Sequence, residues 1–230
     1  MKRASLIPIV GMHLACAEAR LPHPSSSDET RSPVPSVAFD ATRDARIGAF
    51  LLDHREEWHD FNVPYEDGEE LERLVIGCGC RHILEIGTST GHSTLWLAKA
   101  ALRTGGRVTT IEIDPGRHRR AVTNFAEAGV DDVVDARLGD AMKVIPKLGG
   151  AVDFVFSDAT WSTQPANGYT EFFRLVEPKI TDGGLFTMHN VTDGYGDDGR
   201  FFRYLEGLGT YETRIVHTSH AGISVSRKRR

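Results

Sequence analysis

A chain of 230 residues, 40% of them hydrophobic, is long enough for one domain with a sizeable core. Its formal net charge of −5 argues against a nucleic-acid partner, because a protein that binds nucleic acid presents a basic face. The three cysteines, Cys16, Cys78 and Cys80, are too few for a disulfide framework and are spaced wrongly for a zinc knuckle. We interpret them as reduced thiols, which favours a cytoplasmic location.

Residues 1–39 are predicted to form a flexible N-terminal segment ahead of the domain. Two basic residues precede an apolar run that ends in Ala-Cys-Ala at 15–17, the pattern of a signal-peptidase site. Proline, glycine and histidine interrupt this run, and it is too short to span a membrane. A cleaved signal peptide over 1–17, followed by a linker rich in proline and serine, is the alternative to a cytoplasmic location. We therefore expect a domain over 40–230 and no stable membrane insertion.

From residue 41 onward, the spacing of apolar residues predicts regular secondary structure. Helical spacing indicates an amphipathic helix over 41–58 and a short helix that carries Leu71, Leu74 and Val75 inward. Short apolar strands then alternate with helices. In chain order, the predicted strand and helix pairs are 82–87 and 91–103, 107–113 and 115–128, 133–138 and 141–147, 152–157 and 168–177, and 184–189 and 199–207.

This alternation predicts an α/β fold with a mostly parallel sheet and helices on both faces. The end of the chain differs, because "YETRIVHTSH" and "GISVSRKR" are joined by Ala221-Gly222 with no room for a helix. Two strands joined in this way pair as a hairpin. We therefore expect a seven-stranded sheet whose C-terminal hairpin is antiparallel.

The stretch "ILEIGTSTGHSTLWLAKA", residues 83–100, leaves the first predicted strand through Gly87 and Gly91. A dinucleotide site needs G-x-G-x-x-G so that backbone amides can approach a pyrophosphate. Here the spacing is G-x-x-x-G, and Ser89 stands where the middle glycine would be. The wider turn suits a ligand that has no phosphate. The alternative is that the two glycines only make a tight connection between strand and helix.

Acidic residues flank the ends of the predicted strands. Glu85 lies inside an apolar run, where it is held by backbone amides of a nearby loop or faces a cationic ligand such as S-adenosylmethionine. Glu112 ends the second strand, where a carboxylate can accept hydrogen bonds from both hydroxyls of a ribose. Alternatively, Glu112 forms an ion pair with Arg107. Asp140, after the third strand, is placed at the edge of an adenine. NAD and S-adenosylmethionine both carry a ribose, so these acids favour a nucleoside without choosing between the two.

Several motifs resemble the catechol and caffeoyl-CoA type O-methyltransferases, which have the Rossmann-like class I methyltransferase fold. The resemblance runs from about residue 45 to 228. It is carried by "FNVPYEDGEEL", "LEIGTSTGHSTLWLA", "TTIEIDP", "LGDAMKVIPKL", "DFVFSDA", "GGLFTMHNV" and "GISVSRKR". It implies an S-adenosylmethionine cofactor. By position, the implied cofactor-binding residues are Asn62, Val63, Glu85, Gly87, Ser89, Gly91, Ser93, Glu112, Ile113, Asp140, Ala141 and Asp158.

The resemblance also implies a divalent metal, which in that family binds both oxygens of a vicinal diol. The implied ligands are Asp158, His189 and Asn190, but the family has an aspartate where this chain has His189. Mg²⁺ prefers oxygen donors, whereas imidazole suits Mn²⁺ or another transition metal. The histidine therefore changes the metal, acts as a base without one, marks the loss of the metal, or only packs at a strand end.

A second departure follows Asp158, where the family often has a lysine that helps to deprotonate the acceptor. This chain has Thr160 and Trp161 instead. Trp161 lines the acceptor site or belongs to an insertion loop. The general base is therefore open, and His189 is the leading candidate because imidazole titrates near neutral pH.

These patterns predict an O-methyltransferase that acts on a hydroxyl of a small aromatic molecule, with Asp158 and His189 as catalytic residues. The alternatives are a nicotinamide-dependent oxidoreductase, and a binding protein that has kept the methyltransferase fold without activity. Relatives are often dimers, and the apolar helix over 41–58 is a candidate surface for a homodimer.

Overall fold

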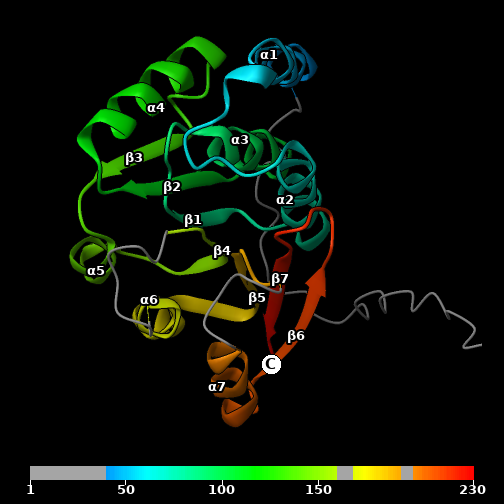
Figure 1. The fold of residues 1–230 in the computed structure, drawn as a ribbon, viewed down its shortest axis with the longest axis vertical. Coiled ribbons are helices and arrows are strands. Elements are labelled where there is room, and N and C mark those ends of the chain that lie inside the picture. The colour runs from blue at the N-terminus through cyan, green and yellow to red at the C-terminus, as the bar shows by residue number, and fades with distance from the viewer. Residues whose placement is uncertain (1–39, 160–167, 193–198) are drawn as a thin grey trace, which may run out of the picture. The chain divides into compact units, whose positions relative to one another are not determined.

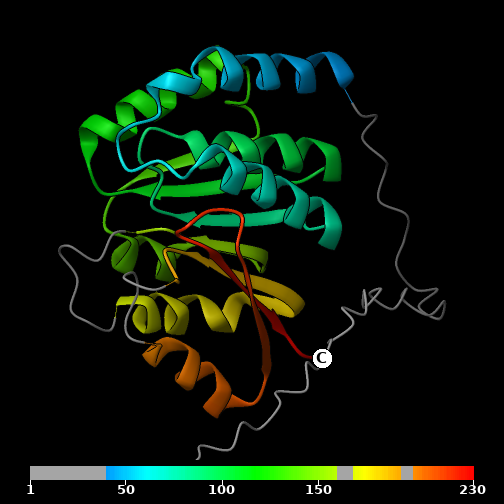
Figure 2. The same cartoon turned by 45° about the vertical axis from the view of Figure 1, so that its right-hand side comes forward.

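The alternating apolar segments form a seven-stranded sheet with helices on both faces (Figures 1 and 2). This computed structural model describes residues 40–159, 168–192 and 199–230. The chain divides into two units, Met1–Pro35 and Ser36–Arg230, and all described residues belong to the second. The domain boundary expected at residue 40 lies at the edge of the described residues. The signal-like stretch at 1–17 lies outside them, and both stay predictions.

The sheet has the order β3-β2-β1-β4-β5-β7-β6. Its strands are β1 (His82–Ile86), β2 (Arg107–Glu112), β3 (Val134–Leu138), β4 (Val152–Ser157), β5 (Ile180–His189), β6 (Tyr211–Val216) and β7 (Ile223–Lys228). The pairs among β1 to β5 are parallel, and β7 is antiparallel to both β5 and β6. The predicted fold class and the antiparallel end of the sheet are confirmed.

Seven α-helices connect or precede these strands in the described part of the chain. They are α1 (Ala41–Asp53), α2 (Tyr65–Cys78), α3 (His92–Thr104), α4 (Pro115–Ala128), α5 (Ala141–Val144), α6 (Gly168–Val176) and α7 (Arg200–Leu208). The capping residues of α4 explain where this helix begins and ends. Asp114 accepts hydrogen bonds from the backbone of Gly116 and Arg117, and Gly129 ends the helix with a positive φ of 75°.

Two hydrophobic clusters pack on opposite faces of the sheet, because successive residues of a strand point to opposite sides. Ile83 belongs to the cluster that α1, α2, α3 and α4 cover. Leu84, the next residue, belongs to the cluster that contains side chains of α5, α6 and α7. Since the strand order reverses between β1 and β4, the carboxyl ends of these two strands mark the place where ligands bind in open α/β sheets.

Helix α1 is shorter than predicted, because it ends at Asp53 and a 3₁₀ turn over Arg55–Glu57 follows. Its apolar residues Ile47, Phe50 and Leu51 are buried in the core of its own domain. The apolar face of this helix, which was the candidate surface for a homodimer, therefore packs inside the domain. The homodimer stays a prediction, but these residues are not its surface.

The connection between β6 and β7 is longer than the two residues expected from the sequence. Val216 ends β6 and Ile223 begins β7, so His217–Gly222 form a loop. The strand-like "HTSH" leaves the sheet because Thr218 and Ser219 donate hydrogen bonds to Asp67 of α2. These two hydrogen bonds attach the loop to α2.

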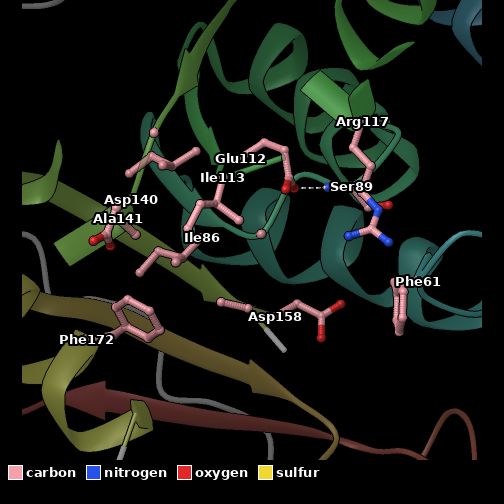
Figure 3. Close-up of a pocket in the computed structure, with 14 residues that line it drawn as sticks. Phe61, Ile86, Ser89, Glu112, Ile113, Arg117, Asp140, Ala141, Asp158 and Phe172 are labelled. Atoms are coloured by element: carbon pink, nitrogen blue, oxygen red, sulfur yellow. Dashed lines mark hydrogen bonds between the residues drawn. The ribbon is translucent and has the colours of Figure 1, made fainter. Parts of the chain in front are cut away.

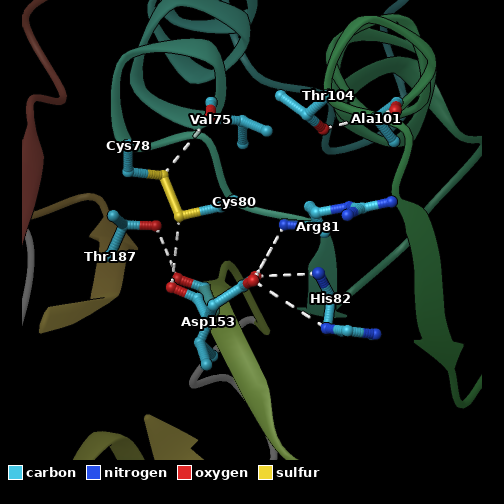
Figure 4. The surroundings of a disulfide bond; sticks show 10 residues. Val75, Cys78, Cys80, Arg81, His82, Ala101, Thr104, Asp153 and Thr187 are labelled. Atoms are coloured by element: carbon cyan, nitrogen blue, oxygen red, sulfur yellow. Dashed lines mark hydrogen bonds and ion pairs between the residues drawn. A yellow bond between two sulfur atoms is a disulfide. The ribbon is translucent and has the colours of Figure 1, made fainter. Parts of the chain in front are cut away.

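The expectation of reduced thiols is wrong for Cys78 and Cys80, which form a disulfide across Gly79 (Figure 4). Gly79 has a φ of 64° and ends α2, a conformation that glycine adopts without strain. The reversal brings the two Cα atoms to 5.2 Å, so both side chains meet at the end of the helix. The cysteines thus give no support to a cytoplasmic location. Cys16 lies outside the described residues.

Within the described ranges, no helix is long and apolar enough to cross a membrane.

Candidate functional site

A pocket opens at the carboxyl ends of β1, β2 and β4 (Figure 3). Seven residues predicted from the sequence line it: Gly87, Ser89, Glu112, Ile113, Asp140, Ala141 and Asp158. Seven others line it that were not among the predicted site residues: Phe61, Ile86, Ile111, Arg117, Gly139, Ala159 and Phe172. Ala141 and Asp140 lie near Phe172 at one end, and Phe61 and Arg117 lie at the other.

The glycine turn presses the end of β1 against the end of β4. A Cβ atom on Gly87, whose φ is +99°, would lie 2.9 Å from the backbone of Asp158 and Ala159. A Cβ atom on Gly91 would lie 2.6 Å from the ring of Phe125 in α4. Gly91 therefore serves helix packing, whereas Gly87 serves the close approach of two strand ends at the pocket.

Between the glycines, Ser89 has a positive φ of 47°, a strained conformation for a residue with a side chain. Its backbone N–H donates to Oε2 of Glu112 over 2.7 Å. The other oxygen of Glu112 accepts from the backbone of Asp114 over 2.9 Å. Both oxygens are thus fixed by backbone donors, which presents a rigid carboxylate to the pocket.

Asp140 and Ile113 frame the region predicted for the adenine. Asp140 is the N-cap of α5, and its Oδ1 accepts from the backbone of Met142 over 2.9 Å. Ile113 is 64% exposed, although it is a large apolar residue beside a pocket. An exposed apolar side chain there can pack on the flat face of a base.

Glu85 is fully buried and does not line the pocket. Its hydrogen-bond donors are hydroxyl groups and not the backbone amides of a loop, which the sequence suggested. Ser93 and Thr110 each donate to the carboxylate over 2.6 Å, and Thr94 donates to it as well. Burial raises the pKa of Glu85 to about 7, and the three hydroxyl donors only partly oppose this shift. Glu85 and Ser93 therefore form a structural pair behind the turn.

The substitution Glu85→Gln is expected to remove a pH dependence of stability. A carboxyl group whose pKa rises from 4.5 to about 7 on folding contributes stability that is fully present below pH 4.5 and is lost as the pH rises through 7. Between pH 5 and pH 8 the free energy of unfolding of the wild type should fall, relative to that of Glu85→Gln, by about 2 to 3 kcal/mol. Urea unfolding of both proteins at the two pH values measures this difference.

The exposed Glu69→Gln variant is the control for this experiment, because Glu69 lies on the surface of α2. A stability difference between wild type and Glu85→Gln that stays constant with pH would contradict the buried, proton-binding state of Glu85.

The loop before α2 is fastened to the glycine turn. Asn62 donates to the hydroxyl of Thr90 over 2.9 Å. The carbonyl of Val63 accepts from Nδ1 of His92 over 3.0 Å; burial lowers the pKa of His92 to about 4, so its ring is neutral. Asn62 and Val63 thus lie beside the turn and not on the pocket. Their neighbour Phe61 lines the pocket in their place.

The charge of the pocket is mainly negative among the described residues that line it. Glu112, Asp140 and Asp158 supply three carboxylates. The guanidinium of Arg117 is the one basic group among these lining residues, and it is already paired with Asp60 over 2.9 Å and lies 4.7 Å from the ring centre of Phe61. Such a lining favours a cationic ligand and offers little to a phosphate.

The three predicted metal ligands come together at the ends of β4 and β5, but as hydrogen-bond partners. Nδ1 of His189 lies 3.3 Å from Oδ1 of Asp158, and Nε2 of His189 lies 2.8 Å from Oδ2 of Asp67. Nδ2 of Asn190 donates to the same Oδ1 of Asp158 over 3.1 Å. Asn190 has a positive φ of 59°, which turns its amide back toward Asp158.

The divalent metal stays a prediction. Nε2 of His189 faces Asp67 and Nδ1 faces Asp158, which is also the arrangement of a metal-ligating histidine with a carboxylate behind it. Within the described ranges, no group of three or more His, Cys, Asp and Glu side chains is arranged to hold a metal. Burial lowers the pKa of His189, but the Asp158 and Asp67 carboxylates outweigh burial and raise it to about 9.

Two further residues from the sequence, Thr160 and Trp161, lie outside the described residues. Their place in an acceptor site stays a prediction.

Residues 84–191 match a family described as methyltransferase domain. A catechol O-methyltransferase of Niastella koreensis is 35% identical over 56% of this chain and 58% of its own length. A catechol O-methyltransferase of Mycobacterium tuberculosis is 42% identical over 58% of this chain and 59% of its own length. The aligned part of this chain therefore covers less than two thirds of these relatives.

Solved structures with the same fold include two O-methyltransferases. One, from Streptomyces achromogenes in complex with SAM and involved in tomaymycin synthesis, aligns with a TM-score of 0.67 at 25% identity, covering 85% of this chain and 93% of its own. The other, from Bacillus cereus in complex with SAH, aligns with a TM-score of 0.66 at 23% identity, covering 80% and 91%. The shared fold places the strand ends of this pocket in a class I methyltransferase architecture.

Proposed function

We propose that the protein is an S-adenosylmethionine-dependent O-methyltransferase, a proposal supported by the match of residues 84–191 to a methyltransferase-domain family. The proposal depends mainly on the rigid Glu112 carboxylate. It lies beside a glycine turn that lacks the G-x-G-x-x-G spacing of a pyrophosphate site. In the proposal, Glu112 accepts hydrogen bonds from the ribose hydroxyls. Asp140 and Ala141 lie at the edge of the adenine, and Ile113 packs on the face of the adenine ring. The negative lining of the pocket suits the sulfonium and ammonium charges of the donor.

The transferred methyl group passes from sulfur to an acceptor oxygen in a single displacement. A carbon–oxygen bond forms as the carbon–sulfur bond breaks, and the donor leaves as neutral S-adenosylhomocysteine. The acceptor must be held in line behind the methyl carbon, and its hydroxyl proton must leave. The protein contributes alignment and one proton acceptor.

Asp158 is the proposed proton acceptor. It lines the pocket at the end of β4, and its Oδ1 is already occupied by His189 and Asn190. Its Oδ2 is therefore the oxygen available to an acceptor hydroxyl. His189 does not take this role, because both of its nitrogens are engaged and its raised pKa keeps it protonated at neutral pH.

The proposed acceptor is a small aromatic molecule that carries a hydroxyl group. The names of the two catechol O-methyltransferase relatives support this class. A cytoplasmic location is part of the proposal, because an exported enzyme would find little methyl donor.

Release of S-adenosylhomocysteine tests the proposal. Catechols, single phenols and hydroxycinnamoyl thioesters are incubated with S-adenosylmethionine and the protein, and the product is measured by mass spectrometry. Methylation of at least one acceptor is expected. If the protein binds the donor but methylates none of them, the binding-protein alternative is favoured. If it binds NAD and not the donor, the oxidoreductase alternative is favoured.

A further inference from the structure

Arg117 of α4, the one basic side chain among the described residues that line the pocket, is held by a loop outside it. Its Nε donates to Oδ2 of Asp60 over 3.1 Å, and its Nη2 donates to Oδ1 over 2.9 Å. The guanidinium also lies 4.7 Å from the ring centre of Phe61, as Figure 3 shows. Phe61 has a positive φ of 53° and is 64% exposed. Two neighbouring residues of the loop before α2 therefore fix the direction of the Arg117 side chain.

A second carboxylate, that of Glu112, competes for the same guanidinium. Each of its oxygens accepts one backbone N–H, and a carboxylate can accept about four hydrogen bonds. The hydrogen bonds to Asp60 raise the pKa of Arg117, and the charges of Asp60 and Glu112 raise it further. Glu112 is 5% exposed, whereas the side chain of Asp60 is 48% exposed. Because water screens charges, a guanidinium released from Asp60 is drawn to the buried carboxylate.

The choice between these two partners decides whether the ribose site is open. In the proposed complex Glu112 accepts hydrogen bonds from the ribose hydroxyls through the positions that its backbone donors leave free. Arg117 would occupy those positions if it were paired with Glu112. Pairing with Asp60 keeps the guanidinium at the end of the pocket, beside Phe61.

Ser89 fixes both competing residues relative to the glycine turn. Its backbone N–H donates to Glu112 over 2.7 Å, and its hydroxyl donates to the backbone carbonyl of Asp60. The positive φ of Ser89 belongs to this double contact. Asp60 is therefore held at a set place beside the pocket, although its side chain is half-exposed.

We propose that Asp60 is a positioning residue for donor binding, which holds Arg117 away from Glu112 and thereby keeps the ribose carboxylate free. The inference rests on the proposed function and deepens it. Asp60 acts through Arg117 and contacts neither the ribose nor the transferred methyl group. Loss of the Asp60 carboxylate should therefore matter only while Arg117 is present.

Calorimetry with S-adenosylhomocysteine tests this dependence. Asp60→Ala should weaken binding roughly 10-fold, because the ribose must then displace the guanidinium, and hydrogen bonds to charged groups have effects of this size. In the Arg117→Met background, the same change at Asp60 should alter the Kd less than about 2-fold, since no guanidinium is left to compete. Asp60→Glu keeps a carboxylate for Arg117 and should bind nearly as the wild type does.

Asp135→Ala is the matched control, because Asp135 of β3 forms an exposed ion pair with Arg137 and does not line the pocket. It should leave the Kd unchanged. An equal loss of affinity on Asp60→Ala with and without Arg117 would show that Asp60 acts by itself, which contradicts the inference. Wild-type affinity in Asp60→Ala would contradict it as well.

NMR of the protein without any ligand supplies the second test. The Nε–H signal of Arg117 is assigned by its loss in Arg117→Met, and its exchange with water is measured. Exchange should be slow in the wild type and in Asp60→Ala, and faster once Glu112→Gln is added to Asp60→Ala. Fast exchange already in Asp60→Ala would overturn the inference, because the guanidinium would then lie in water.

The two tests separate the inference from the proposed function. If S-adenosylhomocysteine fails to bind the wild type while the exchange pattern is as expected, the proposed function fails. The competition between Asp60 and Glu112 for Arg117 then stands by itself.

Discussion

Replacement of Glu112 by glutamine is expected to weaken the binding of S-adenosylhomocysteine roughly 100-fold, which corresponds to about 2.7 kcal/mol. In the proposed complex the carboxylate accepts from two ribose hydroxyls, and hydrogen bonds to a charged group contribute about 1.5 to 3 kcal/mol each. The substitution also places an amide N–H opposite one of the backbone donors, Ser89 or Asp114. Isothermal calorimetry on both proteins measures the change.

Glu127→Gln is the control for this prediction, because Glu127 is exposed on α4 and does not line the pocket. It should bind S-adenosylhomocysteine as the wild type does. If Glu112→Gln and the wild type bind S-adenosylhomocysteine with equal affinity, Glu112 does not contact the ribose.

The second large effect is expected for Asp158→Asn. An amide cannot accept the proton of the acceptor hydroxyl, and general-base groups contribute about 10²- to 10⁴-fold to a rate. We therefore expect kcat to fall by about this factor. The affinity for S-adenosylhomocysteine should change little, because Glu112 and the adenine region are untouched. Steady-state kinetics and calorimetry on the same preparation separate the two quantities.

The fall in kcat should not occur in Asp182→Asn, which changes the same chemical group on an exposed part of β5. A normal kcat in Asp158→Asn would show that another group takes the proton. A lost affinity for S-adenosylhomocysteine together with a normal kcat at saturation would assign Asp158 to donor binding instead.

The strand and helix order could be predicted from the sequence because it depends on local patterns. Apolar strands, the Asp114 cap and the glycine that ends α4 are read from neighbouring residues. The errors arose where distant contacts override such patterns. Thr218 and Ser219 have a strand-like neighbourhood but leave the sheet for Asp67, 151 and 152 residues away.

The candidate site was predictable at the strand ends and not elsewhere. Glu112 ends a buried strand and Asp158 follows one, so their place at one edge of the sheet follows from topology. Glu85 lies inside β1, one residue before its end, and its side chain points into the protein, where three hydroxyl groups donate to it. Asp67 reads as one more polar residue of an amphipathic helix, and its contact with His189 spans 122 residues. Only the folded structure brings that pair together.

Equilibrium binding shows whether the pocket binds a positively charged nucleoside that has no phosphate. Calorimetry of the purified chain with S-adenosylmethionine, S-adenosylhomocysteine and NAD compares the three ligands under one condition. We expect saturable binding of the two sulfur nucleosides at one site per chain and no heat with NAD. Heat with NAD and none with either sulfur nucleoside would contradict it.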